Sequence, residues 1–181
     1  MTDDAAPSPT TACPECGAMG RKVATVTLEA LLTEDARARL GDSGSFRFCK
    51  TQTCDVAYFG QREAARFHRR DVRVPIYQKA TESSRLVRYC FEHRVRDIET
   101  EVRRAGVSSI PDAIGQKCKA GLDHCEEMNP QGSCCLGNVR KVVKHAQDSL
   151  AAAPTHASGH SEASETCCAE GDRNDSGTAN D

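Results

Sequence analysis

The chain has 181 residues and a net charge of −2, with 38% hydrophobic residues, 4% aromatic residues and no Trp. This length allows one ordinary domain or two small ones with tails, and the charge excludes a strongly basic or strongly acidic protein. Because aromatic side chains usually dominate the burial of apolar surface, we expect only a thin hydrophobic core.

Eleven cysteines are the outlier of the composition. The first residues carry Asp3 and Asp4 and have neither a basic start nor an apolar run, so they do not resemble a secretory signal. No stretch has the roughly 18 apolar residues of a membrane helix, and no membrane insertion is expected. We therefore expect a cytoplasmic protein whose thiols stay reduced and bind metals in preference to forming disulfides.

The two ends of the chain differ from its middle. Residues 1–12 and 151–181 are rich in small and polar side chains with little to bury, which predicts two disordered tails. Next come short strands and one helix, with Thr27 as its N-cap and Gly41 as its stop signal. The predicted ranges are a strand at 21–26, the helix at 27–40, strands at 46–49 and 56–59, and, after a basic connector, a strand at 72–76.

The second half of the chain is predicted to be mainly helical. Apolar residues recur at helical spacing over 94–105, and Gly106 follows them as a stop signal. Two more helices are predicted at 111–119 and 135–150. A boundary between the two halves is expected within 79–85.

The first four cysteines have the spacing of a zinc site. Cys13 and Cys16 form a CxxC knuckle, a tight turn that presents two sulfurs to one ion, and Cys49 and Cys54 supply a second pair. Four thiolates make a closed tetrahedral shell that suits structural zinc, and zinc binding adds folding free energy on the order of 10 kcal/mol in small domains. This spacing predicts a zinc-binding domain over residues 13–78.

Two other interpretations of these four cysteines stay open. They could be unrelated buried thiols, or Cys13 and Cys16 could form a redox couple of the thioredoxin kind. A redox CxxC is expected to follow a buried strand and to open a helix, whereas this one follows a polar tail. The zinc site is therefore the favoured interpretation.

Five further cysteines fall within residues 79–150. Thiolates at this density suit an iron–sulfur cluster or a thiophilic ion such as copper(I), although Cys118 can also be a small core residue on a helix. The stretch Asn129–Gly132 is typical of a turn, which would return the chain to a helix start where thiolates are favoured. The five candidate ligands are Cys90, Cys118, Cys125, Cys134 and Cys135.

The last two cysteines, Cys167 and Cys168, are adjacent in the C-terminal tail near His156 and His160. Adjacent thiols on a mobile segment can capture a soft metal ion and pass it on by ligand exchange, and they could equally be incidental. Together these patterns predict an α+β fold. It comprises a small zinc-stapled strand and helix unit, then a mainly helical cysteine-rich unit, between disordered termini.

Taken in order, these motifs resemble the amino-terminal half of CopZ-type copper metallochaperones, from Cys13 to about Lys144. The motifs that carry the resemblance are Cys13–Cys16, Phe48-Cys49, Cys54–Phe59, Tyr89-Cys90, Cys125 and Asn129–Cys135. The resemblance implies two cofactors. These are a zinc ion on Cys13, Cys16, Cys49 and Cys54, and a [2Fe-2S] cluster with Cys90, Cys125 and Cys135 among its ligands.

The chain departs from the family in two places. The family has Cys-Tyr-Cys where this chain has Arg88-Tyr89-Cys90, and a guanidinium cannot replace a thiolate. A fourth ligand would come from Cys134, Cys118 or a group other than cysteine, or else the cluster is altered, labile or absent. The family's separate copper-binding domain also has no counterpart, and the stretch Thr166–Ala169 instead is similar to the vicinal-cysteine end of mercuric reductases.

The sequence therefore predicts a metallochaperone or metal-resistance accessory protein that binds copper(I) or mercury(II). It would pass the ion to a transporter, reductase or regulator, and the resemblance implies that a cluster could reduce copper(II) to copper(I). No catalytic residues are predicted, because no nucleophile–base arrangement and no glycine-rich phosphate loop is present. The alternatives are a small ferredoxin-like electron-transfer protein and, less favoured, a nucleic-acid-binding zinc protein, since basic residues outnumber acidic ones over 61–110.

Overall fold

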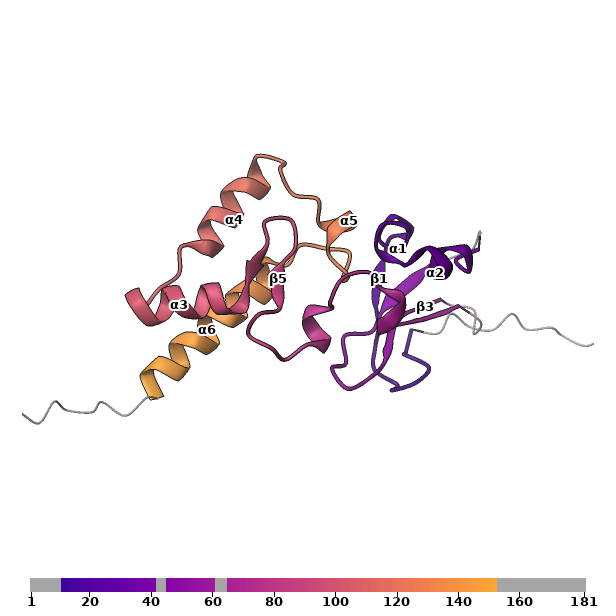
Figure 1. Cartoon of the computed structure of the whole chain (residues 1–181), viewed down its shortest axis with the longest axis horizontal. Coiled ribbons are helices and arrows are strands. Elements are labelled where there is room, and N and C mark those ends of the chain that lie inside the picture. Colours follow the sequence, from indigo (N-terminus) through magenta and orange to yellow (C-terminus); the bar gives the residue numbers. More distant parts are fainter. Residues whose placement is uncertain (1–10, 42–44, 61–64, 153–181) are drawn as a thin grey trace, which may run out of the picture.

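The computed structural model describes residues 11–41, 45–60 and 65–152. A strand-rich unit and a mainly helical unit lie side by side (Figure 1), which confirms the predicted α+β fold class. The tails predicted at 1–12 and 151–181 fall almost wholly outside the described residues. None of the helices in the described part of the chain has the length and hydropathy to cross a bilayer.

The first unit is built on a four-stranded antiparallel sheet in the order β1-β2-β3-β4. Strand β3 is buried on both faces, because Ala57 and Tyr58 pack in the main core while Val56 and Phe59 pack against cysteines. The strands are β1 (Arg21–Val23), β2 (Phe46–Phe48), β3 (Val56–Gly60) and β4 (Arg66–His68). Three of the four predicted strands are therefore present, each close to its expected range.

The prediction of one helix over 27–40 is wrong in one respect, because this segment forms two helices. They are α1 (Thr25–Leu31) and α2 (Glu34–Ala38). The break occurs at Leu32, whose extended backbone pairs with Val72, and at Thr33, whose hydroxyl accepts a hydrogen bond from the Ala36 amide. Thr27 caps neither helix and is fully buried in α1. The N-cap at Thr33 therefore starts a new helix, although the apolar pattern continues through this position.

The strand predicted at 72–76 is also wrong. Strand β4 lies earlier in the chain and is followed by two short 3₁₀ helices, η1 (Arg69–Asp71) and η2 (Tyr77–Lys79). The Asp71 carboxylate accepts a hydrogen bond from the His68 amide at 2.7 Å, which stabilises the first of these turns. Within the predicted strand, Val72 forms an isolated β-bridge with Leu32. Pro75 has no backbone N–H to donate to a neighbouring strand.

The second unit contains the three helices that the sequence predicts. They are α3 (Val95–Ala105), α4 (Ile110–Lys119) and α6 (Leu136–Ala152), and their apolar faces enclose a core that includes Ile98, Ile114 and Val139. A short hairpin of β5 (Leu86–Arg88) and β6 (His93–Arg94) and a one-turn helix, α5 (Cys125–Met128), were not predicted. Elements this short leave too few residues for a periodic pattern.

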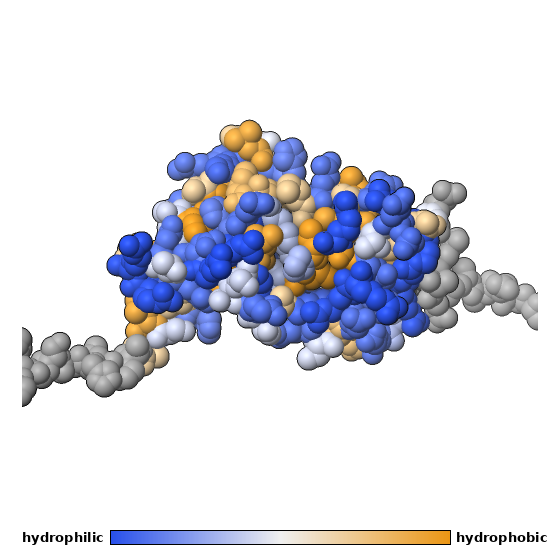
Figure 2. Space-filling model, in the orientation of Figure 1, coloured by the Kyte–Doolittle hydropathy of each residue, from blue (hydrophilic) through white to orange (hydrophobic). Residues whose placement is uncertain are grey.

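The two units meet where α5 and the turn behind it pack against α1 (Figure 1). The Tyr58 hydroxyl on β3 donates a buried hydrogen bond to the Pro130 carbonyl at 2.7 Å. Gly132, with a φ of 61°, lies so close to the first unit that a Cβ on it would be 2.9 Å from Thr27 Oγ1. Figure 2 shows a largely hydrophilic face, with hydrophobic residues gathered near this junction.

We predict that Gly132→Ala destabilises the protein by about 1–3 kcal/mol. Alanine would have to adopt a left-handed backbone conformation at this position, and its methyl group would collide with Thr27 in α1. The matched control is Gly115→Ala in α4, where a Cβ meets no atom within 4 Å. That control should be neutral or stabilising by up to about 1 kcal/mol, as expected for a helical glycine. Urea unfolding measures both changes in stability, and equal effects of the two substitutions would contradict the close approach of Gly132 to α1.

Candidate metal centre

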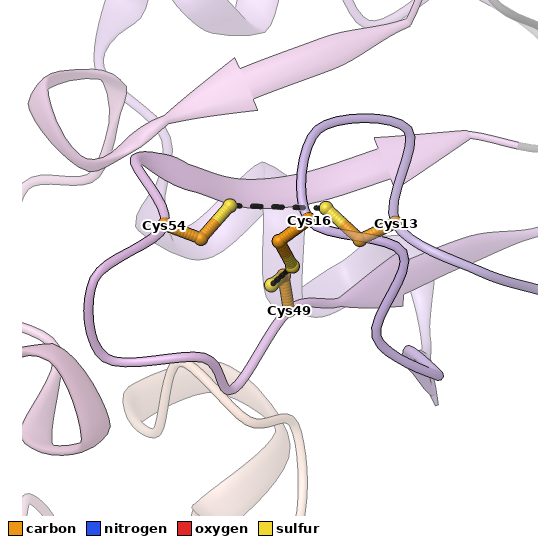
Figure 3. Close-up of side chains that lie close together, drawn as sticks. All are labelled: Cys13, Cys16, Cys49 and Cys54. Carbon is orange, nitrogen blue, oxygen red and sulfur yellow. Dashed lines mark hydrogen bonds between the residues drawn. The ribbon is translucent and has the colours of Figure 1, made fainter.

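Four cysteine sulfurs from two loops converge at one end of the sheet (Figure 3). The Sγ atoms of Cys13, Cys16, Cys49 and Cys54 all lie within 4.8 Å of one another, and all four thiols are free. The Cys13–Cys54 distance is 3.8 Å and the Cys16–Cys49 distance is 3.6 Å. A tetrahedral site with zinc–sulfur bonds of about 2.3 Å has sulfur–sulfur edges of about 3.8 Å, so these residues fit a zinc ion.

The local sequence explains why the sulfurs meet. Cys13 and Cys16 lie on a tight turn in which the Gly17 amide donates to the Cys13 carbonyl at 2.8 Å. Gly17 has a φ of 70°, which favours glycine at that position. Cys49 follows β2 and Cys54 precedes β3, so the antiparallel pairing of those strands brings the second pair together.

A buried lysine that the sequence did not single out supports the second pair. Lys79 is only 3% exposed, and its ammonium donates to the carbonyls of Thr51 and Cys54, both at 2.8 Å. It therefore fixes the loop between Cys49 and Cys54 and places a positive charge beside a cluster of thiolates. No sequence signal marks Lys79, because lysines are nearly always exposed and it lies in the predicted boundary.

The four thiols differ in their electrostatic environment. Burial raises the pKa of Cys13 and of Cys54, which favours their protonated form when no metal is present. Cys16 is exposed, and hydrogen bonds from the Thr51 side chain and the Ala18 backbone lower its pKa to about 6. One ligand is thus a thiolate at neutral pH, whereas the buried thiols must release protons when a metal binds.

We predict that Cys16 is the first of the four cysteines to react when the metal-free protein meets iodoacetamide at pH 7, because only thiolates are good nucleophiles. Cys54 should react last, and its rate should keep rising with pH after that of Cys16 has levelled off. Peptide mapping by mass spectrometry measures both rates. Cys134 is the matched control, being exposed but without the Thr51 contact, and equal rates for the four cysteines would contradict the prediction.

The second set of cysteines surrounds an arginine. Arg88 is fully buried at the end of β5, and its guanidinium lies 3.5 Å from the sulfurs of Cys118 and Cys135 and 3.8 Å from that of Cys125. Among the described residues, only the Cys13 set forms a group of three or more metal-ligand side chains within 4.8 Å. Cys134, a further predicted ligand, is exposed, and Cys90 is partly exposed.

Burial and the arginine act in opposite directions on these thiols. Burial raises the pKa of Cys135, and the hydrogen bond and charge of Arg88 oppose that rise. Burial also raises the pKa of Cys125. For Arg88 itself, burial lowers the pKa, but the contacts with Cys135 and Cys118 outweigh burial and raise the pKa above its usual value, so the side chain stays charged.

The remaining candidates are in the C-terminal tail. Cys167 and Cys168, together with His156 and His160, lie outside the described residues. Their role as ligands therefore stays a prediction from the sequence.

Comparisons with known proteins agree with the geometry of the first unit. Residues 10–73 match a family model, zf_CopZ, that is described as a zinc binding domain. A curated relative, the copper chaperone CopZ of Archaeoglobus fulgidus, is 27% identical over 131 residues, which cover 72% of this chain and 60% of the relative. The chain thus spans about three fifths of that relative's length.

A solved structure shows the same fold. The X-ray structure of the Archaeoglobus fulgidus CopZ N-terminal domain matches with a TM-score of 0.59 and 24% sequence identity, over 72% of this chain and 96% of that one. The resemblance expected from the cysteine motifs is confirmed: this chain is similar to the amino-terminal region of CopZ-type copper chaperones, and its residues 10–73 match the family model described as a zinc binding domain.

Proposed function

We propose that this chain is a metal-handling accessory protein that keeps one zinc ion as a structural element and passes a soft ion, copper(I), to a protein partner. The observation that carries the proposal is the four-sulfur shell in a segment that matches the CopZ zinc binding domain. We choose copper as the transferred ion because the relative is named a copper chaperone, and its similarity extends beyond the zinc-binding segment over 72% of this chain.

The zinc ion has a structural role in this proposal. Three of its four candidate ligands are buried and form a small cluster with Val56 and Phe59, so the sulfurs are part of the core. Four thiolates leave no open coordination position for a substrate, which is the arrangement of structural zinc and not of catalytic zinc. Zinc would supply a closed, redox-inert link between the Cys13–Cys16 turn and the sheet.

The soft ion needs thiols that the zinc site does not use. Copper(I) prefers thiolate ligands and tolerates a coordination number below four, so two neighbouring cysteines suffice. Cys134 is exposed beside Asp123 and His124, and Cys167 and Cys168 are adjacent in the sequence. We assign capture and transfer to the pair Cys167 and Cys168, because two cysteines adjacent in the sequence can supply the two thiolate ligands that copper(I) needs.

We predict that Cys54→Ser lowers zinc affinity more than about 100-fold. Losing a residue that only hydrogen-bonds a metal ligand costs up to about 100-fold in affinity, and losing a ligand itself should cost more. Serine keeps the shape of the side chain but is a poor ligand for zinc, so the first unit should also unfold at a lower temperature. Native mass spectrometry and thermal unfolding measure these effects. Cys134→Ser is the control and should keep the zinc affinity of the wild type, while an unchanged zinc affinity in Cys54→Ser would exclude the four-cysteine site.

We predict that the double variant Cys167→Ser/Cys168→Ser binds less copper(I) than the wild type in competition with a copper(I) chelator, while its zinc content is unchanged. The control is His156→Ala/His160→Ala, which alters the same tail but leaves both thiols. Transfer of copper(I) from the protein to an acceptor thiol protein should fall with the first variant alone. Unchanged copper binding in that variant would show that the adjacent cysteines are incidental.

A further inference from the structure

Three cysteines of the second unit surround the side chain of Arg88. Arg88 ends strand β5 between two other buried residues, Val87 and Tyr89, and is among the largest fully buried side chains of the protein. Its guanidinium faces sulfurs from three segments: Cys118 in α4, Cys125 in α5, and Cys135 just before α6. The arginine therefore lies where these segments converge.

The surroundings of Arg88 hold it in this position. Its guanidinium carbon stacks 4.6 Å from the centre of the Phe91 ring, and Lys117 places its ammonium 4.2 Å from the same ring. Among the described residues, no carboxylate pairs with Arg88, and its Nε has no hydrogen-bond partner. Because an uncompensated buried charge costs several kcal/mol, the sulfurs and the Phe91 ring are the groups that stabilise it.

These residues do not fit the [2Fe-2S] cluster that the family resemblance implies. A cluster of this kind needs four ligands with free lone pairs, usually thiolates, whereas a guanidinium has five N–H donors and no acceptor. The sulfurs of Cys118, Cys125 and Cys135 point at that cation within 3.8 Å, so a cluster and Arg88 would compete for the same space. Moving Arg88 aside would require rearranging the hairpin in which it is fully buried.

We infer that the second cysteine set of this chain is a cluster-free centre in which the Arg88 guanidinium replaces an inorganic cofactor. The arginine supplies the positive charge that the surrounding sulfurs face, and its N–H groups join α4, α5 and the start of α6 to β5. The second unit thus folds around its own cation and needs no iron. This inference does not depend on the metal that the tail carries or on the zinc site.

The first test is the composition of the full-length wild-type protein, purified without oxygen from iron-supplemented cells and then incubated with ferrous iron, sulfide and a reducing thiol. We expect zinc, only background iron and sulfide, and no absorption band in the visible region. Iron and acid-labile sulfide in equal, near-stoichiometric amounts, with such a band, would overturn the inference.

The second test replaces the arginine. Arg88→Cys adds a sulfur in place of the cation, and after the same treatment we expect it to gain iron, sulfide and a visible band. The matched control is Arg85→Cys in the preceding loop, whose guanidinium contacts backbone carbonyls and the Tyr77 ring but no cysteine, and which should stay colourless. A folded Arg88→Cys protein that takes up no more iron than the control would show that Arg88 is not what excludes the cluster. If Arg88→Cys does not fold, the wild-type result decides alone.

Discussion

The first unit depends on four sulfur atoms that lie too close together to be stable as thiolates without a cation. At separations of 3.6–3.8 Å, two negative charges in a partly buried site repel one another strongly. A zinc ion converts this repulsion into the attraction that ties the Cys13–Cys16 turn to the ends of β2 and β3. Lys79 adds a second positive charge from outside the shell, and it also fixes the loop that carries Cys54.

The second unit gathers cysteines in a comparable way, and we propose that it uses a cation of a different origin. Arg88 is part of the chain, cannot dissociate, and stays protonated at any physiological pH. A metal-filled centre depends on the supply of its ion, whereas a guanidinium centre forms as soon as the chain folds. The two halves of the molecule would therefore respond differently to a chelator, although both are rich in thiols.

The sequence predicted the parts of this structure that depend on spacing. Local patterns predicted the four cysteines of the first site and the turn after Asn129. They also predicted the apolar faces of α3, α4 and α6. The break at Leu32 was missed because, besides the local N-cap at Thr33, it involves pairing with Val72, forty residues away. The positions of Lys79 and Arg88 were missed for the same reason: a charged residue is buried only where distant segments supply its partners, and single-sequence patterns do not report such segments.

The hydrogen bond between Tyr58 and Pro130 gives the molecule a short mechanical connection between its two thiol-rich regions. Tyr58 lies on β3, four residues after Cys54, which precedes that strand, and Pro130 lies in the turn that ends shortly before Cys134. Strand β3 is buried along most of its length, and its pairing with β2 and β4 holds Tyr58 in place. A loss of zinc that loosened the start of β3 would therefore also weaken the hydrogen bond that holds the turn before Cys134.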